Sequence, residues 1–261
     1  MTAEGQPEGT VGKALAVLET VAERGEPIRF SDLLETSRYP KATLYRLVQT
    51  LTRQQMLRHD PQTGTYALGV RLVRLAHSAW AQSSLAPLAR PHVDALSAAT
   101  GETIHLAQLD RGQVLYVDKR NAARPIEMFA QAGKVGPAYC TGVGKAMLAF
   151  LDDEGLAEAL KAQSFYRHTK HTITSEDALR AELAGIRELG YALDREEHEL
   201  GIICCAVPVL SRTHRPLGAI SLTTTVARAT LAQLDEKAAL LLETAARIAE
   251  DAESWRFPER T

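Results

Sequence analysis

Residues 38–51, RYPKATLYRLVQTL, and residues 60–69, DPQTGTYALG, decide the fold of the first part of the chain. The apolar residues of the first segment recur at spacings of three and four, which predicts an amphipathic helix over residues 41–54. Its inward-facing residues are Leu44, Leu47, Val48 and Leu51. The second segment begins with a turn, residues 60–64, that joins β-type runs at residues 56–59 and 65–68, so the sequence predicts a hairpin directly after the helix.

The residues upstream of this segment predict two more helices. Val11–Arg24 is amphipathic and is followed by Gly25 and Pro27, which end helices. Asp32–Thr36 predicts a short second helix with Ser31 as its N-cap.

A tight turn then leads to the third helix, with Pro40 at its first position. Helix, helix, turn, helix and hairpin form the pattern of a winged helix-turn-helix domain. The N-terminal residues of its third helix can reach base edges in the major groove. We therefore expect DNA contacts from this helix, the turn before it and the hairpin, namely Arg38, Tyr39, Lys41, Ala42, Thr43, Tyr45, Arg46 and Arg58.

The charge distribution favours the same function. The chain has 261 residues and a formal net charge of −2. Residues 38–74 contain seven basic residues and one acidic residue, a net charge of +6, so the rest of the chain carries −8. A basic segment in an acidic protein is typical of a nucleic-acid-binding module. The alternative is a small helical subdomain with a basic solvated face and no role in DNA binding.

Composition excludes several classes of protein. The chain is 45% apolar and 24% charged, and it has three cysteines. These values exclude low-complexity, collagen-like and disulfide-rich chains. No apolar run approaches the length of a membrane span, and the polar N-terminus lacks a signal-peptide pattern. The sequence therefore predicts a cytoplasmic protein without membrane contact.

The rest of the chain predicts an α+β arrangement. We expect a DNA-binding domain over residues 8–69, a linker helix over 70–84 and a second domain over 85–255. Strands are expected at 103–109, 113–119, 126–130, 191–196, 202–210 and 217–226. Helices are expected at 88–99, 144–151 and 154–162, from a Thr174 cap to 189, and as one long helix at 230–251.

Several segments together resemble the IclR family of bacterial transcriptional regulators. The two opening segments resemble its winged-helix half. GPAYCTGVGKAMLAFL (136–151), GYALDREEHELGIICCAVPV (190–209) and LGAISLTTT (217–225) resemble its effector-binding half. The resemblance implies a GAF-like second domain with a mainly antiparallel sheet that senses a small molecule, often an organic acid. It also implies operator DNA as partner and a homodimer or a dimer of dimers.

Three positions depart from the family pattern. Ser37 and Gln55 stand where glycines are usual before the third helix and before the hairpin. Thr224-Thr225 stands where Gly-Pro is usual after the last strand. The first two departures concern backbone geometry near DNA, and the third concerns the loop that closes the effector pocket.

The resemblance also implies the effector-binding residues, which are Met128, Gly136, Gly142, Val143, Asp194, Ile202, Cys204, Ser221 and Thr223. N–H groups after Thr141 are suited to a carboxylate at the start of a helix. Ser221 and Thr223 are two residues apart, so both point to one face of a strand. Met128 and Ile202 supply apolar wall, and Gly136 leaves room for a bulkier ligand. Asp194 either contacts the ligand or orients its own loop.

Other readings of the sequence are disfavoured. GVGKA (142–146) lacks the first glycine and the hydroxyl residue of a phosphate-binding loop. His198 and Cys204 lack a third orienting group for nucleophilic catalysis, and the cysteines and histidines lack zinc-ligand spacing. We therefore expect no enzyme activity, no catalytic residue, no cofactor and no obligatory metal. The main alternative function is a small-molecule sensor that acts through a protein partner rather than DNA.

Overall fold

The computed structural model describes residues 9–83 and 85–254, and it divides into two compact units, Met1–Gln82 and Ser83–Thr261. Glu8, Ser84 and Trp255, which bound the three expected domains, lie outside the described residues. No helix within the described ranges is long and apolar enough to cross a membrane.

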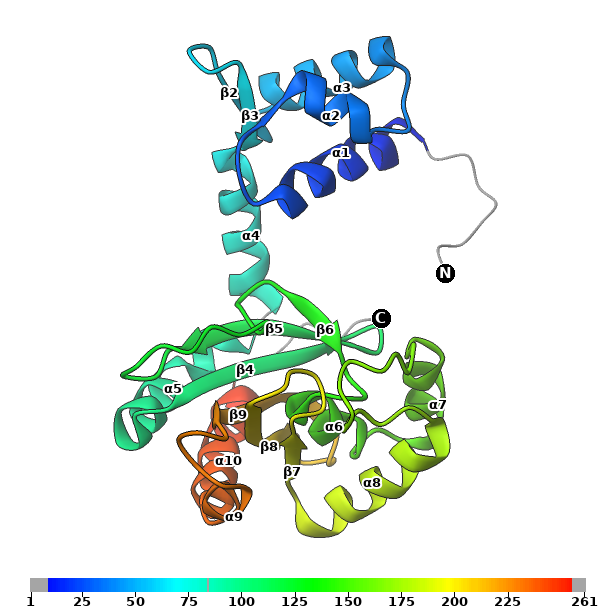
Figure 1. Cartoon of the computed structure of the whole chain (residues 1–261). Coiled ribbons are helices and arrows are strands. Elements are labelled where there is room, and N and C mark those ends of the chain that lie inside the picture. The colour runs from blue at the N-terminus through cyan, green and yellow to red at the C-terminus, as the bar shows by residue number, and fades with distance from the viewer. Residues whose placement is uncertain (1–8, 84, 255–261) are drawn as a thin grey trace. The chain divides into compact units, whose positions relative to one another are not determined.

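The N-terminal unit consists of helices around a small sheet (Figure 1). Its elements are α1 (Thr10–Arg24), β1 (Ile28–Arg29), α2 (Phe30–Thr36), α3 (Lys41–Arg53), β2 (Leu57–Asp60), β3 (Thr65–Leu68) and α4 (Val70–Ser83). The antiparallel sheet has the order β1-β3-β2. The four apolar residues predicted to face inward from α3 are buried together with Val17, Leu33 and Tyr66. This arrangement confirms the predicted winged helix-turn-helix.

The start of this unit differs from the prediction in three details. Ile28–Arg29 forms a strand that the sequence did not predict, because its two residues pair with Tyr66 and Thr65 of β3. The second helix begins at Phe30, so Ser31 lies inside it and donates its hydroxyl proton to Asp32 instead of capping the helix. Pro40 is the N-cap of α3 rather than its first residue.

The two unusual residues near the third helix have different backbone conformations. Ser37 has φ −84° and ψ 137°, extended backbone that requires no glycine. Gln55 has φ 58°, the left-handed region in which glycine is favoured. The family's preference for glycine is thus explained at residue 55, and Gln55 adopts the same conformation at some cost.

The C-terminal unit has a single six-stranded antiparallel sheet of order β6-β5-β4-β9-β8-β7. Its strands are β4 (Thr103–Asp110), β5 (Gln113–Arg120), β6 (Val135–Pro137), β7 (Ala192–Arg195), β8 (Ile202–Leu210) and β9 (Pro216–Thr225). Its helices are α5 (Ala86–Thr100), α6 (Gly142–Leu148), α7 (Asp153–Lys161), α8 (Glu176–Leu189), α9 (Leu231–Asp235) and α10 (Ala238–Ser254). Mixed helices and antiparallel strands confirm the predicted α+β class.

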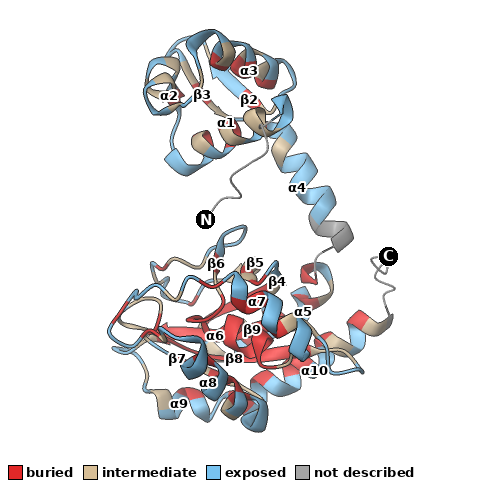
Figure 2. Ribbon diagram, turned by 90° about the vertical axis from the view of Figure 1, so that its right-hand side faces the viewer, coloured by how far each residue is buried: buried red, intermediate tan, exposed pale blue. Residues whose placement is uncertain are grey.

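Helices cover both faces of this sheet. Cys204, Ala206 and Ala219 belong to one core cluster with residues of α6, α7 and α8. The alternate residues of the same strands point to the opposite face, where α5 and α10 pack against β4 and β8. Figure 2 shows the strands in red as a buried layer and the outer helix faces in blue.

Three predictions for this unit are wrong in detail. Residues 126–130 form no strand because their polar groups bond outside any ladder, and the edge strand is β6 instead. Ser175, not Thr174, caps α8, since its hydroxyl accepts from the N–H of Ala178. The expected helix over 230–251 is divided into α9 and α10 by a turn in which Lys237 N–H bonds to the Leu234 carbonyl.

Candidate functional site

The outer face of α3 is polar and exposed. Lys41, Ala42, Tyr45 and Arg46 are exposed, and Thr43 is half-buried. The opposite face carries the four buried apolar residues, so packing against α1 fixes which side of the helix meets solvent. The ring of Tyr45 is braced edge-on by Phe30 at 5.8 Å between centroids.

The turn before α3 is held by its own side chains. The Ser37 hydroxyl accepts from the N–H of Tyr39 at 3.1 Å. The guanidinium of Arg38 lies over the Tyr39 ring and donates to its hydroxyl at 3.2 Å. A cation on an aromatic face is partly ordered before it meets a ligand. Arg38 and Tyr39 therefore form one preorganised polar group beside the N-terminus of α3.

The hairpin presents Arg58 on an exposed strand position opposite Ala67. Its turn is closed by Asp60, whose carbonyl accepts from Gly64 N–H and whose carboxylate accepts from Gln62 N–H. The Gln62 hydrogen bond lowers the pKa of Asp60, which stays charged. All eight residues predicted to contact DNA thus lie on α3, on the turn before it or on the hairpin; whether they contact DNA stays a prediction.

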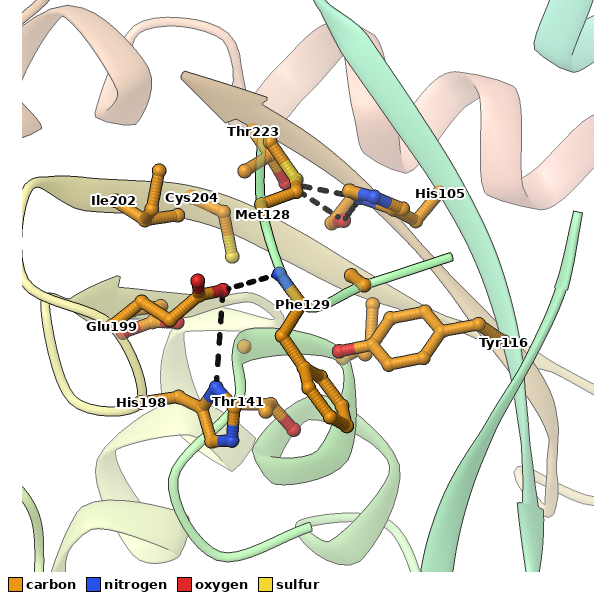
Figure 3. A pocket seen from close by; sticks show the side chains of 15 residues that line it. His105, Tyr116, Met128, Phe129, Thr141, His198, Glu199, Ile202, Cys204 and Thr223 are labelled. Carbon is orange, nitrogen blue, oxygen red and sulfur yellow. Dashed lines mark hydrogen bonds and ion pairs between the residues drawn. The ribbon is translucent and has the colours of Figure 1, made fainter. Parts of the chain in front are cut away.

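The C-terminal unit contains a cavity between the sheet, α6 and residues 128–130 (Figure 3). Eight of the nine predicted effector-binding residues line it, and Gly136 does not. Residues that the prediction omitted also line it, namely His105, Tyr116, Phe129, Ala130, Thr141, His198 and Glu199. Its free volume is about 40 Å³, which is small for a site that holds an organic ligand.

The floor of the cavity is a patch of polar side chains on one face of the sheet. Asp194, Cys204 and Thr223 are direct partners on β7, β8 and β9. Ser221 is two residues from Thr223, and its own partner on β4 is His105. Directly paired residues of antiparallel strands share a face, so the five side chains converge on the cavity.

Glycine at position 142 lets α6 approach this floor. A Cβ atom there would collide with Sγ of Cys204 and lie 3.3 Å from Cβ of Ala206. The helix has no side-chain N-cap, because Thr141 donates its hydroxyl proton to the Pro137 carbonyl. The first N–H groups of α6 are therefore left without a capping side chain beside Asp194 and Cys204.

Residues 128–130 cover the cavity and are held in place by two hydrogen bonds. The Glu199 carboxylate accepts from Phe129 N–H at 2.9 Å, and Lys119 Nζ donates to the Ala130 carbonyl at 3.0 Å. The Phe129 ring packs against His198 in a tilted arrangement, with 4.9 Å between the ring centroids. It also occupies the space beside Gly136, where a Cβ would lie 3.0 Å from the ring. Gly136 thus accommodates Phe129 rather than lining the cavity.

Buried charges lie directly behind the floor. Lys145 of α6 is completely buried and bonds to Glu197, to Glu182 and to the Leu193 carbonyl. Asp194 accepts from Glu197 N–H at 2.8 Å. Burial and the charge of Glu197 raise the pKa of Asp194 to about 7, against the opposing effects of that hydrogen bond and of Lys145. Both the protonated and the ionised form of Asp194 are therefore populated near neutral pH.

The structure disfavours a phosphate-binding loop at residues 142–146 and a catalytic role for Cys204. Lys145 is held by two carboxylates inside the core, so GVGKA does not present a lysine to a nucleotide. Burial raises the pKa of the Cys204 thiol well above its usual value, which opposes its use as a nucleophile. Within residues 9–83 and 85–254, no group of three His, Cys, Asp or Glu side chains is placed to hold a metal ion.

Some missed residues carried a signal in the sequence. His105 is the one ionisable residue in the apolar run IHLA, and it is two residues from Thr103 and Ala107 on one strand face. A histidine inside such a strand suggests a built polar site. Phe129, His198 and Glu199 lie on irregular segments, where no periodicity predicts direction.

A winged helix-turn-helix unit with a basic exposed α3 defines a DNA-binding protein, and its second unit encloses a polar cavity. Comparisons with known proteins agree with this class. The family model "IclR helix-turn-helix domain" matches residues 10–61. The model "Bacterial transcriptional regulator IclR C-terminal" matches residues 77–250.

Individual relatives span nearly the whole chain. The HTH-type transcriptional regulator XynR of Escherichia coli (strain K12) is 32% identical over 225 residues, 86% of this chain and 89% of the relative. The crystal structure of Thermotoga maritima IclR has a TM-score of 0.78 at 27% identity and covers 92% of this chain and 97% of its own.

A second similar structure is an IclR homologue from Microbacterium hydrocarbonoxydans complexed with 4-hydroxybenzoate. Its TM-score is 0.83 at 24% identity, and the match covers 94% of this chain and 100% of that chain. This likeness supports the fold.

The chain belongs to the IclR family of bacterial transcriptional regulators. It is a DNA-binding transcriptional regulator. The family and the relatives are regulators rather than enzymes, which confirms the expectation that this chain is not an enzyme.

Proposed function

We propose that α3 reads operator DNA in the major groove while Arg58 of the hairpin holds the backbone beside it. The observation that carries this proposal is that α3 is amphipathic. Its leucines are buried on one face, and Lys41, Tyr45 and Arg46 are exposed on the other. Lys41 and Arg46 supply charge to phosphates or guanine edges, and Thr43 and Tyr45 read bases or fix the register.

The test of this interface is fluorescence anisotropy with duplex DNA from upstream of the protein's own gene. Arg46→Ala should weaken binding by about 1–3 kcal/mol and relax specificity at one position if Arg46 reads a base. If it contacts only phosphate, binding should weaken uniformly and the salt slope should fall by about one. Arg180→Ala is the matched control, because Arg180 is an exposed arginine on α8 that pairs with Glu176. Equal binding by Arg46→Ala and wild type would contradict the proposal.

We also propose that the cavity binds a small organic-acid effector. Support comes from the convergence of Asp194, Cys204, Ser221 and Thr223 on one buried patch, since buried polar groups of this number are typical of a ligand site. Uncapped N–H groups after Thr141 are suited to the carboxylate, and Met128 and Ile202 form the apolar wall. The small free volume implies that residues 128–130 move when the effector enters.

Adding carboxylic acids to the protein–DNA complex tests the effector site. An effector must release or tighten DNA binding, because it binds the DNA-competent and DNA-incompetent states with different affinity. Thr223→Val, which removes one hydroxyl from the floor, should weaken that response. Thr244→Val on α10, whose hydroxyl bonds only within its helix at Leu240, should leave it unchanged.

We further propose a homodimer, or a dimer of dimers, that uses α4. Val70, Val73 and Leu75 of this helix are all more than half exposed, and Figure 2 shows most of the described part of α4 in blue. Exposed apolar residues of this number mark an association surface. A dimer would place two α3 helices in major grooves about 34 Å apart or a multiple of that. Light scattering on Val73→Asp should show dissociation to a smaller species.

A further inference from the structure

Three of the seven basic residues in segment 38–74 have no part in the proposed DNA interface. They are Arg53 at the end of α3, and Arg71 and Arg74 in the first two turns of α4. All three side chains are exposed. Their surroundings indicate what kind of partner they meet.

Two of these arginines carry uncompensated charge. Among the residues that the structure describes, the guanidinium groups of Arg53 and Arg74 have no ion-pair or hydrogen-bond partner. In the C-terminal unit, by contrast, Arg180, Arg195 and Arg247 each pair with a glutamate. The sequence of α4 contains no acidic residue that could do the same. Like charges that gather without counter-charge repel one another, so a partner that supplies negative charge is favoured here.

The third arginine joins the start of α4 to the end of α3. Nη1 of Arg71 donates to the side-chain oxygen of Gln54 at 2.6 Å and to the Gln54 carbonyl at 3.2 Å. The N–H of Arg71 donates to the Gln55 carbonyl, and the N–H of Gly69 donates to the Met56 carbonyl. A guanidinium has five N–H donors, so Nε and Nη2 of Arg71 stay available within the described part of the chain.

These bonds place the three arginines on one surface, which we call the basic corner. Arg71 and Arg74 line one hollow with Gln55, where α3 ends and α4 begins, and Arg53 directly precedes the Gln54 that Arg71 holds. Helix stability does not explain this arrangement, because the first turn of a helix is the positive end of its dipole and disfavours a cation.

The length of α3 relates the basic corner to DNA. This helix has 13 residues, so it is about 20 Å long at 1.5 Å per residue. The major groove is about 12 Å wide, and it winds around the duplex while the helix is straight. When the N-terminal residues of α3 reach base edges, the end that carries Arg53 therefore lies near the sugar-phosphate backbone.

We propose that Arg53, Arg71 and Arg74 form a second DNA-contacting surface, which binds phosphates at the border of the major groove and brings α4 directly into DNA binding. This inference rests on the proposed position of α3 in the major groove and extends the interface beyond it. Phosphate contacts fix the orientation of a protein on the duplex and carry no sequence information. The basic corner therefore contributes affinity rather than specificity.

Fluorescence anisotropy across a salt series tests this surface in the full chain. The probes are a duplex from upstream of the protein's own gene and a random duplex of equal length. Arg74→Gln removes one charge and should reduce the steepness of the salt slope by about 0.9. It should weaken binding to both duplexes by the same factor, roughly fivefold to tenfold at 0.1 M salt. Arg53→Gln combined with Arg74→Gln should change the slope about twice as much.

Two controls separate a phosphate contact from a structural role. Gln54→Met removes the side-chain partner of Arg71 but retains the arginine, so the salt slope should not change, whereas Arg71→Met should lower its steepness by about 0.9. Arg247→Gln on α10 removes an exposed arginine that pairs with Glu243, and it should leave both the affinity and the slope unchanged. The melting temperature of Arg74→Gln should equal that of wild type, because no bond within the described residues is lost.

Each result is decisive. Wild-type affinity and slope in Arg74→Gln and in Arg53→Gln would overturn the second surface, while the proposed role of α3 stands. Weakening confined to the upstream duplex would assign base recognition to these arginines and overturn their role as phosphate contacts. Absence of DNA binding by the wild-type chain would overturn the proposed role of α3, and this inference with it.

Discussion

Lys145 of α6 and Glu197 of the β7–β8 connection form an ion pair in the core, with the lysine side chain completely buried. The same ammonium group donates to the Leu193 carbonyl at 2.8 Å and to Glu182 at 3.0 Å. Burial alone would lower the pKa of Lys145, but the two carboxylates outweigh it and raise the pKa. The pair therefore joins the helix beside the cavity to the connection that follows β7, the strand that carries Asp194.

Lys145→Met should destabilise the protein strongly. It removes the partner of Glu197, whose second oxygen already lacks a hydrogen bond among the described residues. Removing one member of a buried ion pair costs about 3–5 kcal/mol, because the other charge stays buried. Urea unfolding followed by circular dichroism measures this loss.

A double variant separates charge from packing. Lys145→Met combined with Glu197→Leu leaves no unpaired charge at this position, and it should recover most of the loss. Additive losses in the double variant would contradict the account, since they would show that each side chain acts independently.

Asp194 should make stability depend on pH. Its pKa is raised from 3.8 to about 7 in the folded protein, so the folded state retains the proton to higher pH than the unfolded state does. The stability that the protonated form provides is present in full below the unfolded pKa and is lost as the pH rises through about 7. Asp194→Asn removes this dependence and retains an acceptor for Glu197 N–H.

The free energy of unfolding of Asp194→Asn, minus that of wild type, should therefore be larger at pH 8 than at pH 5 by roughly 2–3 kcal/mol. The comparison with wild type at each pH cancels the effect of other titrating groups, including His198, whose pKa is lowered to about 4 by burial and by His168. A difference that does not change between the two pH values would show that Asp194 is ionised throughout.

Gln55→Gly should stabilise the N-terminal unit. Gln55 has φ 58° directly after α3, where glycine adopts the left-handed conformation without strain. We expect a gain of about 0.5–1 kcal/mol, since relief of strain is partly offset by the greater freedom of glycine when unfolded. Gln54→Gly should destabilise instead, because Gln54 has φ −82° and its side chain binds Arg71. Thermal denaturation measures the melting temperature of both variants. We expect it to rise in Gln55→Gly and to fall in Gln54→Gly.

Glu199→Ala should loosen the cover of the cavity. The Glu199 carboxylate accepts the Phe129 N–H, the bond that ties residues 128–130 to the β7–β8 connection. Hydrogen exchange of the Phe129 amide should accelerate by about tenfold or more, since a lost charge-assisted bond is worth about 1.5–3 kcal/mol. Glu188→Ala on α8 is the control. Unchanged exchange in Glu199→Ala would mean that other contacts hold the cover.

Most of the longer helices and strands followed from the sequence, whereas the short strands β1 and β6 and the irregular segments did not. The spacing of Leu44, Leu47, Val48 and Leu51 predicted α3 and its buried face, because burial of an apolar stripe is a local property. Residues 126–130 resemble a strand in sequence, but their path depends on hydrogen bonds to Lys119 and to Glu199, which is 70 residues from Phe129. No local pattern contains that information.

In the candidate site, too, features set by local sequence were predicted and features set by distant parts of the chain were not. The predicted polar residues of β7, β8 and β9 come together because strand register places them there. His105 was missed although β4 pairs with β9, since the order of strands in a sheet is not a local property of the sequence. Gly136 was predicted as part of the wall, but the Phe129 ring fills the space beside it.

The most direct test of the account is fluorescence anisotropy of the full chain with duplex DNA from upstream of its own gene, across a salt series and with and without 4-hydroxybenzoate, lactate and pyruvate. We predict binding about a thousandfold tighter than to random duplex, a steep negative salt slope, and a change in affinity with at least one acid. Absence of binding to any DNA at low salt would contradict the central claim.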